Sequence, residues 1–332
     1  MQIFRGFKHP GIALASAVTI GNFDGVHRGH QAMLALLNNE ARHRNVTSCV
    51  LTFEPHPRDY FAALARKPEL APARIATLRD KLCELAACGV GQCVVLPFDA
   101  RLSSQSPHDF IDQVLVRGLG AKYVLVGDDF RFGAKRAGDY ALLDSAGSSR
   151  GIDVARMNSY EVRGARVSSS AVRQALGRGD MGAVAALLGR PYSISGHVVH
   201  GRKLGRVLGF KTLNLRFAHW KPAASGIFAV EVHGLHPEPL QGVANLGIRP
   251  SLDPADVNGG RVLLETHCLQ WPQALGAEGA YGKIIRVELL HKLHDELKYD
   301  GLDALTQGIR KDCDEVRAFF ASTRRQTTRD RI

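Results

Sequence analysis

A chain of 332 residues is long enough to form two globular domains, each with its own hydrophobic core. The composition, 45% hydrophobic and 23% charged, excludes a disordered or fibrous protein, and no apolar run approaches the roughly 20 residues that cross a bilayer. The net charge of +11 comes from both halves, so it marks no single nucleic-acid-binding tail, and the six cysteines form no C-x-x-C pair for zinc or redox chemistry.

The first half of the chain alternates short apolar runs with stretches of helical spacing. The apolar runs are expected to be buried strands, and helices are expected between them, as at Leu78–Ala87 and Phe110–Leu119. This alternation predicts an α/β fold with a doubly wound parallel sheet, in which ligands bind beyond the carboxyl ends of the strands. The expected strands are Ala17–Ile20, Cys49–Phe53, Cys93–Leu96, Tyr123–Val126 and Val154–Met157.

The first expected strand leads into the stretch Gly21-Asn-Phe-Asp-Gly-Val-His-Arg-Gly-His30. Helical spacing begins at Met33, so His27 and His30 stand where a strand gives way to a helix N-terminus, whose free N–H groups and dipole favour phosphate. Gly29 has no side chain to obstruct the two imidazoles. The pattern indicates attack on the α-phosphate of a nucleoside triphosphate, with both histidines stabilising the developing charge. Two polar histidines in a solvated turn are the plain alternative.

This ten-residue string resembles the motif of the prokaryotic bifunctional riboflavin kinase/FMN adenylyltransferases, often called FAD synthetases. Within it, His27-Arg-Gly-His30 is similar to the H-x-G-H signature of nucleotidyltransferases. The resemblance implies a nucleotidyltransferase domain, placed at residues 1–188, that adenylylates FMN with ATP. It also implies that His27 and His30 are catalytic and that Asn22 contacts the nucleotide.

The second expected strand is followed by Phe53-Glu-Pro-His-Pro-Arg-Asp-Tyr-Phe61. Its two prolines predict an extended loop that projects aromatic rings and could line an apolar slot. By spacing alone, a rigid surface loop with its aromatics tucked into the core is an equal alternative. By resemblance to the FAD synthetases, this segment lies beside the flavin ring, and the matching positions are Phe53, Pro55, Pro57 and Phe61.

Two later motifs of the first half also suit a nucleotide. Val126-Gly-Asp-Asp-Phe-Arg-Phe-Gly133 puts two acids at a strand end, and by resemblance Asp129 contacts the nucleotide. Val167-Ser-Ser-Ser-Ala-Val-Arg173 predicts a helix N-terminus whose hydroxyls and amides favour phosphate. A plain turn and an ordinary helix cap are the respective alternatives. The resemblance implies that the second motif holds the ATP triphosphate through Ser168, Ser169, Ser170 and Arg173.

Beyond Pro191 the pattern changes to β-rich runs separated by Gly, Pro and Asn turns. This pattern of short strands and turns predicts an antiparallel barrel or sandwich, placed at residues 189–332. An amphipathic helix from Leu302 to Phe320, capped by Asp300, is expected to close the chain. The expected strands are Ile194–Val199, Ile227–Val232, Gly242–Asn245, Val262–His267 and Ile284–Leu290.

Early in the second half, the loop Gly201–Gly209 combines a glycine at every fourth position with three cations. Such a loop can bring N–H groups against phosphate, although a solvated hairpin tip is an even alternative. In the extended segment that follows, Thr212 and Asn214 point the same way and offer two oxygen ligands suited to Mg²⁺. Phosphate contacts are expected from Gly201, Lys203, Gly205 and Arg206.

The segment Phe210–Leu215 resembles the riboflavin kinase signature Gly-Phe-Pro-Thr-Ala-Asn. It departs at Lys211, where proline is usual, and at Leu213, where alanine is usual. Thr212 and Asn214, the metal and phosphate ligands by resemblance, are kept. The departures therefore put the geometry of the segment in doubt more than its chemistry.

Two further strings extend the resemblance to the kinase. Val243-Ala-Asn-Leu-Gly-Ile-Arg-Pro250 matches a family segment, and Leu264-Glu-Thr-His267 matches the strand that carries the catalytic glutamate. The resemblance implies that Glu265 accepts the proton of the ribityl 5′-hydroxyl. A strand glutamate otherwise usually faces solvent. His294 stands where the family usually has arginine, which predicts a weaker contact on the flavin side.

Taken along the chain, the motifs predict an enzyme that phosphorylates riboflavin with ATP to FMN and then adenylylates FMN with a second ATP to FAD and pyrophosphate. Both steps are expected to need Mg²⁺. A nucleotidyltransferase for another coenzyme precursor is the alternative, but it leaves the second half unexplained. No nucleic acid or membrane partner is expected, because no DNA- or RNA-binding motif accompanies the charge. An N-terminus without a secretion signal predicts a cytoplasmic protein, and the sequence indicates no oligomeric state.

Overall fold

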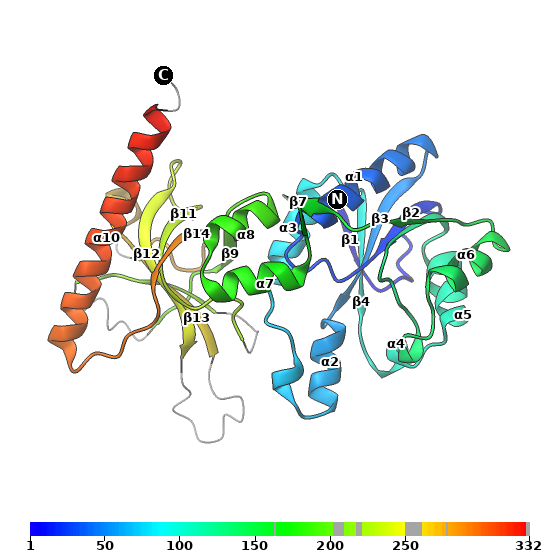
Figure 1. Ribbon diagram of the computed structural model, residues 1–332, viewed down its shortest axis with the longest axis horizontal. Helices are drawn as coiled ribbons and strands as arrows, with labels where there is room; N and C mark the ends of the chain where they lie inside the picture. The colour runs from blue at the N-terminus through cyan, green and yellow to red at the C-terminus, as the bar shows by residue number, and fades with distance from the viewer. Residues whose placement is uncertain (163, 202–208, 217–220, 250–260, 277, 330–332) are drawn as a thin grey trace. The chain divides into compact units, whose positions relative to one another are not determined.

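The computed structural model describes the chain in two compact units (Figure 1). The first contains Met1–Pro72 and Asp80–Ser169, and the second contains Ala73–Arg79 and Ser170–Ile332. The helices α7 (Ser169–Arg178) and α8 (Met181–Leu188) place their buried side chains in the core of the second unit. A boundary between catalytic domains at 188/189 therefore stays a prediction. The residues described are 1–332 without 163, 202–208, 217–220, 250–260, 277 and 330–332.

The first unit is built on a six-stranded sheet in which every neighbouring pair of strands is parallel. This confirms the predicted doubly wound sheet, and all five expected strands are present. The additional strand β1 lies at the sheet edge, and only Phe4 of its four residues is buried, so it has no apolar run to reveal it. The spatial order is β1 (Gln2–Arg5), β4 (Gln92–Pro97), β3 (Thr47–Glu54), β2 (Ser16–Ile20), β5 (Ala121–Gly127) and β6 (Asp153–Met157).

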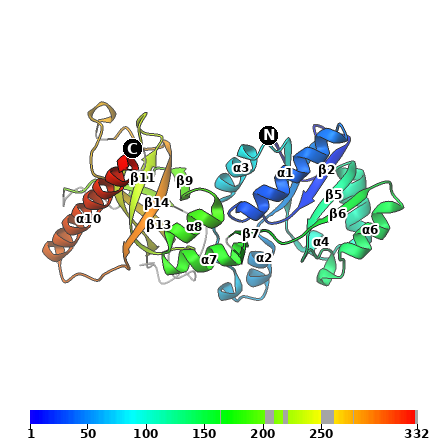
Figure 2. The same ribbon diagram turned by 45° about the horizontal axis from the view of Figure 1, so that its top comes forward.

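Helices cover both faces of this sheet (Figure 2). On one face, α1 (Arg28–His43) and α3 (Leu78–Ala87) pack their apolar side chains against the strands. The other face is covered by α5 (Pro107–Phe110), the π-helical segment η2 (Ile111–Gly118) and α6 (Tyr140–Ser148). The remaining elements are α2 (Pro57–Leu64), η1 (Pro68–Leu70), α4 (Ala100–Ser103), η3 (Ala134–Arg136), β7 (Glu161–Val162) and β8 (Ala165–Arg166).

The strand order places a topological switch at β2. The chain runs from β2 outward through β3 to β4 and then crosses back to β5 on the other side of β2. In open α/β sheets, ligands bind in the crevice beyond the carboxyl ends of the strands at such a switch. The motif at Gly21–His30 follows the carboxyl end of β2, and the motif at Gly127–Asp129 begins at the last residue of β5.

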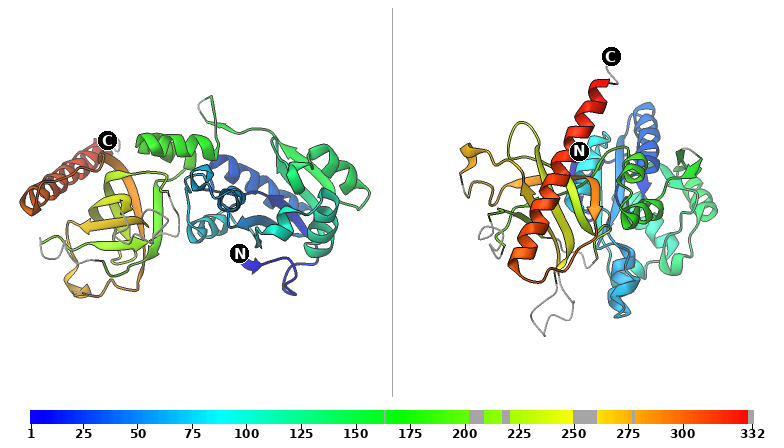
Figure 3. Two further views of the ribbon diagram at one scale, coloured as in Figure 1. Left: turned by 90° about the horizontal axis from the view of Figure 1, so that it is seen from below. Right: turned by 60° about the vertical axis from the view of Figure 1, so that its left-hand side comes forward.

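The second unit is a six-stranded antiparallel sheet that closes into a barrel (Figure 3). A bridge between Val199 and Asn214 joins the two ends of the strand order, and Val199 N donates to Asn214 O at 2.9 Å. The predicted barrel is thus confirmed. The order is β10 (Leu213–Arg216), β13 (Arg261–Cys268), β12 (Leu240–Arg249), β11 (Gly226–His233), β14 (Ile284–His294) and β9 (Tyr192–His197), with η4 (Gln273–Leu275) between β13 and β14.

A long C-terminal helix, α10 (Leu302–Arg329), lies along one side of this barrel, red in Figure 3. Its residues Cys313, Val316 and Phe320 pack against Ala229 of β11 and Val243 of β12. The predicted amphipathic helix is confirmed, and it continues beyond Phe320. Among the described residues, no helix has both the length and the apolarity needed to cross a membrane.

Candidate functional sites

The turn between β2 and α1 is held in an unusual backbone conformation. Phe23 and Val26 have φ values of 49° and 41°, in the left-handed region that strains residues other than glycine. Both side chains are almost completely buried, at 1% and 0% exposed, so core packing maintains the turn. Strained backbone of this kind concentrates at functional sites. The turn carries the chain directly to His27.

His27 and His30 lie face to face at the start of α1. Their ring centroids are 3.6 Å apart with an interplanar angle of 13°. His27 is the N-cap of the helix, and its Nδ1 accepts from His30 N at 3.3 Å. The neutral His27 ring therefore carries its proton on Nε2, which makes this atom a donor. A Cβ at Gly29 would come within 3.3 Å of the His27 ring, so glycine keeps the approach open.

The environment of His30 favours its uncharged form. Burial is the largest effect, followed by the electrostatic influence of His27 and then of Lys81, and together they lower the pKa of His30 well below its ordinary value. Phe23 covers the ring at a centroid distance of 4.9 Å. Within the described part of the chain, the buried His30 Nδ1 has no hydrogen-bond partner. Two stacked imidazoles at a helix N-terminus form an arrangement that can donate to phosphate oxygens.

The two aspartates after β5 have different surroundings. Asp128 accepts hydrogen bonds from Ser159 and from Arg166, and these contacts lower its pKa despite some desolvation. The side chain of Asp129 is 87% exposed, and its carboxylate is 4.0 Å from Arg166 Nη2. Asp128 thus fixes the turn, whereas the exposed Asp129 has room to contact a ligand. Beside them, Phe130 and Phe132 stack at 5.3 Å.

The serine cluster is divided between the two units. Ser169 Oγ donates to Asp24 O at 3.0 Å, which ties this serine to the turn that leads to His27. Ser170 and Arg173 belong to the second unit, where Arg173 Nε donates to Ala73 O at 2.7 Å. A shared role of Ser168, Ser169, Ser170 and Arg173 on a triphosphate stays a prediction.

The segment expected to be an extended loop is helical from Pro57 onward. Proline fits the first turn of a helix, and the His56 side chain caps α2 by accepting from Arg58 N at 3.1 Å. The expectation of an extended loop over Phe53–Phe61 was therefore wrong for its second part. Pro55 is exposed, and Phe61 is 50% exposed.

An aromatic cluster forms around this segment, with a member that the sequence analysis missed. Phe98, directly after β4, makes edge-to-face contacts with Phe53, Tyr60 and Phe61 at centroid distances of 5.5–5.8 Å. Its position at the carboxyl end of a strand was the available sequence signal. Partly exposed aromatic rings at the edge of a parallel sheet suit a flat apolar ligand.

Two of the predicted kinase residues, Asn214 and Glu265, lie in one row that crosses three strands, whereas Thr212 lies just before β10. Asn214 of β10 is directly opposite Glu265 of β13, and Glu265 is directly opposite Asn245 of β12. Residues paired in this way share a face of the sheet and have Cβ atoms about 4.5–5.5 Å apart. The row continues to Ile227 of β11 and His294 of β14. Asn245, to which the sequence analysis gave no role, is therefore part of the same site.

Two amides of this row have oxygen atoms without hydrogen bonds. Asn214 is 3% exposed, and the Oδ1 atoms of Asn214 and Asn245 have no hydrogen-bond partner among the described residues. Buried polar atoms are usually satisfied, so oxygen atoms left open in this way fit a site for a hard cation. A Cβ at Gly201 would come within 2.6 Å of Asn214 Nδ2, so any side chain at this position would displace the Asn214 amide. Lys203, Gly205 and Arg206 lie outside the described residues.

At the far end of the row, His294 faces the C-terminal helix. Its Nε2 is 2.9 Å from Asp312 Oδ1. Burial is the largest single effect and opposes protonation, but the hydrogen bonds to Asp312 and to the Asp295 backbone, together with the nearby carboxylate charges, raise the pKa of His294. His294 is therefore bound to a carboxylate of the C-terminal helix, and the weaker contact to a flavin stays a prediction.

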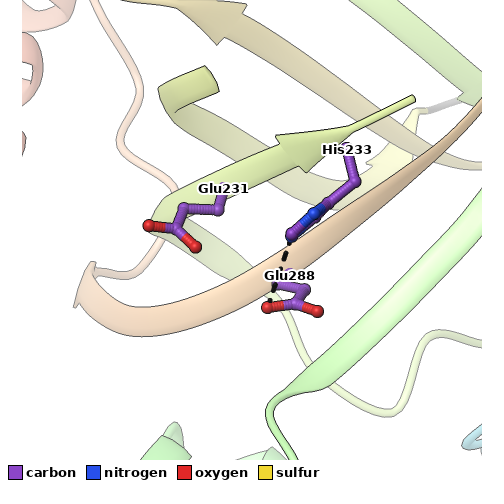
Figure 4. Close-up of side chains that lie close together, drawn as sticks. All are labelled: Glu231, His233 and Glu288. Carbon is purple, nitrogen blue, oxygen red and sulfur yellow. Dashed lines mark ion pairs between the residues drawn. The ribbon is translucent and has the colours of Figure 1, made fainter. Parts of the chain in front are cut away.

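A separate group of possible metal ligands lies on the same barrel (Figure 4). Glu231 and His233 of β11 approach Glu288 of β14, with all ligand atoms within 4.8 Å of one another. Glu288 already has two neighbours, because the Arg286 guanidinium Nη2 lies at 3.0 Å and His233 Nε2 at 3.5 Å. The ion pair with Arg286 accounts for the position of Glu288, and the cluster includes none of the predicted kinase residues.

Two family models and several relatives together match nearly the whole chain. The FAD synthetase family model matches residues 11–171, and the riboflavin kinase model matches residues 188–320. The bifunctional riboflavin kinase/FMN adenylyltransferase of Escherichia coli (strain K12) is 44% identical over 326 residues, which cover 98% of this chain and 99% of that protein. The protein of the same name from Haemophilus influenzae is 40% identical over 97% of this chain and 100% of its own length.

A solved structure shows the same fold. A protein from Streptococcus pneumoniae, described as a macrolide-efflux protein, matches with a TM-score of 0.74 over 96% of this chain and 99% of its own. The two sequences are 24% identical. At this identity the likeness concerns the fold alone.

Proposed function

The chain belongs to the family of bifunctional riboflavin kinase/FMN adenylyltransferases, and on this premise we propose which residues carry each reaction. It phosphorylates riboflavin with ATP to give FMN, and it adenylylates FMN with ATP to give FAD and pyrophosphate. The first reaction is assigned to the barrel and the second to the parallel sheet. We place both in the cytoplasm, since the described cysteines are free thiols, as expected in a reducing compartment.

In adenylyl transfer, a phosphate oxygen of FMN attacks the α-phosphorus of ATP as the bond to the pyrophosphate leaving group breaks. His27 and His30 donate to the α-phosphoryl oxygens, on which negative charge develops. Their stacked rings and the helix N-terminus are already in place, so little reorganisation is needed. Asn22 and Asp129 hold the nucleotide, with Ser168, Ser169, Ser170 and Arg173 on its triphosphate. Phe53, Pro55, Pro57 and Phe61 lie along the flavin, joined by Phe98.

In the kinase reaction, Glu265 accepts the proton of the ribityl 5′-hydroxyl as this oxygen attacks the γ-phosphorus and ADP leaves. Its position between Asn214 and Asn245 puts the base beside two amide oxygens that are open to a ligand. The phosphates are held at Gly201, Lys203, Gly205 and Arg206. Thr212 and Asn214 are the residues that would hold Mg²⁺, which neutralises phosphate charge when bound.

The observation that carries this assignment is the direct pairing of Asn214 with Glu265. A metal ligand and a base must share one side of the sheet to act on one phosphoryl group, and strand register alone ensures this. The purified chain is incubated with riboflavin, ATP and Mg²⁺, and the flavins are resolved by chromatography. FMN followed by FAD is expected. ATP turnover only with a different acceptor, or no turnover, would contradict the proposal.

A further inference from the structure

A lysine is buried beside the histidine turn of the first unit. Lys81, on α3, is 2% exposed. Lysine is almost never fully buried unless its ammonium group is paired, because desolvation of a charge is costly. Neither the motif Gly21–His30 nor the assigned mechanism uses this residue. Its contacts therefore indicate what the buried charge does.

The ammonium group of Lys81 bonds to the ends of two adjacent strands. Its Nζ donates to Asn22 O at 3.4 Å, just after β2, and to Thr52 Oγ1 at 3.2 Å, near the end of β3. Glu54, the last residue of β3, has its Oε2 at 3.9 Å. Thr52 Oγ1 also donates to Asn22 O at 3.3 Å. Lys81 therefore belongs to a small polar network between the two strand ends.

These strand ends lead to the two substrates of adenylyl transfer. The chain after Asn22 continues to His27 and His30, whereas the chain after Glu54 continues through the aromatic segment assigned to the flavin. We propose that Lys81 is a positioning residue for adenylyl transfer, which fixes the histidine turn relative to the flavin-side segment and places its ammonium group where it acts electrostatically on His30. This inference rests on the proposed function of the His27–His30 site.

The charged and titratable groups around Lys81 are consistent with this role. Glu54 of β3 faces it directly, and Lys81 interacts electrostatically with His30 of α1 and Cys93 of β4. Burial raises the pKa of Cys93 to about 12 although Lys81 opposes the rise, so this thiol stays neutral. Lys81 and His27 both lower the pKa of His30. His30 thus stays an uncharged donor next to the Lys81 ammonium group.

Charge removal and packing can be separated by substitution. In Lys81→Met the volume is nearly kept, and Thr52 and Asn22 retain their own hydrogen bond, so the strand ends are expected to stay folded. Glu54→Gln keeps the shape of the other partner but leaves the Lys81 charge uncompensated. The two variants should therefore shift the protonation of His30 in opposite directions. A purely structural lysine would produce no such opposite shifts.

The experiment measures FAD formation from FMN, ATP and Mg²⁺ as a function of pH. Lys81→Met is expected to lower kcat/KM about 10²-fold, the scale of a misplaced reactive group. The acidic limb of the profile of kcat/KM against pH should move to higher pH in this variant, because His30 takes up a proton more easily without the neighbouring cation. For Glu54→Gln the limb should move to lower pH. FMN formation from riboflavin, measured in the same samples, should not change.

Lys122→Met is the matched control, since Lys122 is an exposed lysine on β5 of the same sheet. It should leave both reactions and the pH profile as in the wild type. Wild-type rates and an unshifted profile in Lys81→Met would overturn the inference. If Lys81→Met unfolds, the test depends on Glu54→Gln alone. An acidic limb of its pH profile at the wild-type position would then reject the proposed effect of the Lys81 charge on His30. Absence of FAD formation by the wild type would instead refute the proposed function, and the role of Lys81 with it.

Discussion

The two candidate sites differ in how far apart their residues are along the chain. The histidine site of the first unit lies within one turn, because His27 caps α1 and His30 stacks on it three residues later. The site in the barrel joins Asn214, Asn245 and Glu265, which come from three different strands. A site within one helix turn is visible as a spaced motif, whereas a site built across strands depends on register. The two sites should therefore also respond separately to mutation.

Glu265→Gln should have the largest effect and affect only the barrel. Losing a general base typically costs about 10²–10⁴-fold in rate, so FMN formation from riboflavin should fall by that factor. FAD formation from supplied FMN should persist, because Glu265 is not part of the first unit. Both rates are measured by separating the flavins after incubation with ATP and Mg²⁺. Parallel loss of the two rates would argue against independent sites.

His27→Ala should give the reverse result. Removal of one donor to a developing oxyanion costs about 10²–10³-fold, and FAD formation should fall accordingly. FMN formation should remain near that of the wild type. His43→Ala on the same helix is the matched control, because His43 is exposed in the last turn of α1. An equal effect of the control would mean that the loss comes from the helix rather than from the site.

Gly201→Ala tests the crowding at Asn214. The new Cβ would come within 2.6 Å of Asn214 Nδ2, so the buried amide must move. Overpacking of this kind costs about 1–3 kcal/mol, and we expect slower FMN formation together with a higher Mg²⁺ requirement. A Mg²⁺ titration of the kinase rate measures both. Gly177→Ala in α7, where a Cβ meets nothing within 4 Å, should leave the titration unchanged.

The smallest expected effect concerns the pair His294–Asp312. The folded state raises the pKa of His294, so the pair stabilises the barrel below the unfolded pKa, and this contribution is lost as the pH rises through the folded pKa. Asp312→Asn should therefore lower the melting temperature more at about pH 5.5 than at about pH 8. The change in the free energy of unfolding should stay within about 1 kcal/mol. A melting-temperature difference that does not vary with pH would exclude the proton-linked contribution.

Several parts of both units were predictable because their signals are local. The five expected strands of the first sheet appear as apolar runs, and α3 spans the predicted Leu78–Ala87. The edge strand β1 was missed because only Phe4 of its residues is buried. The helix α2 was missed because Pro55 and Pro57 suggested an extended loop, whereas a proline at the first helical position continues into a helix. Roles on ligands at these positions remain predictions.

Lys81 shows what a closer reading of the sequence offers. It follows Leu78 by three residues and precedes Leu85 by four, so it lies on the apolar stripe of its helix, where a charged residue is unexpected. That spacing indicates a buried lysine, but it cannot identify the partners. Asn22 and Thr52 are distant from Lys81 in the chain. The parallel pairing of β2 with β3 brings Asn22 close to Thr52, and Lys81 of α3 bonds to both.

The sequence by itself determined five of the six strands of the first sheet, the position of the histidine motif at a helix N-terminus and the change from a parallel sheet to a barrel, since each follows from neighbours a few residues apart. Only the tertiary structure decided that Asn214, Glu265 and Asn245 form one row and that Lys81 joins two strand ends. A shift of one residue in strand pairing moves every side chain to the other face. That register is set by packing across the whole unit rather than by any local pattern.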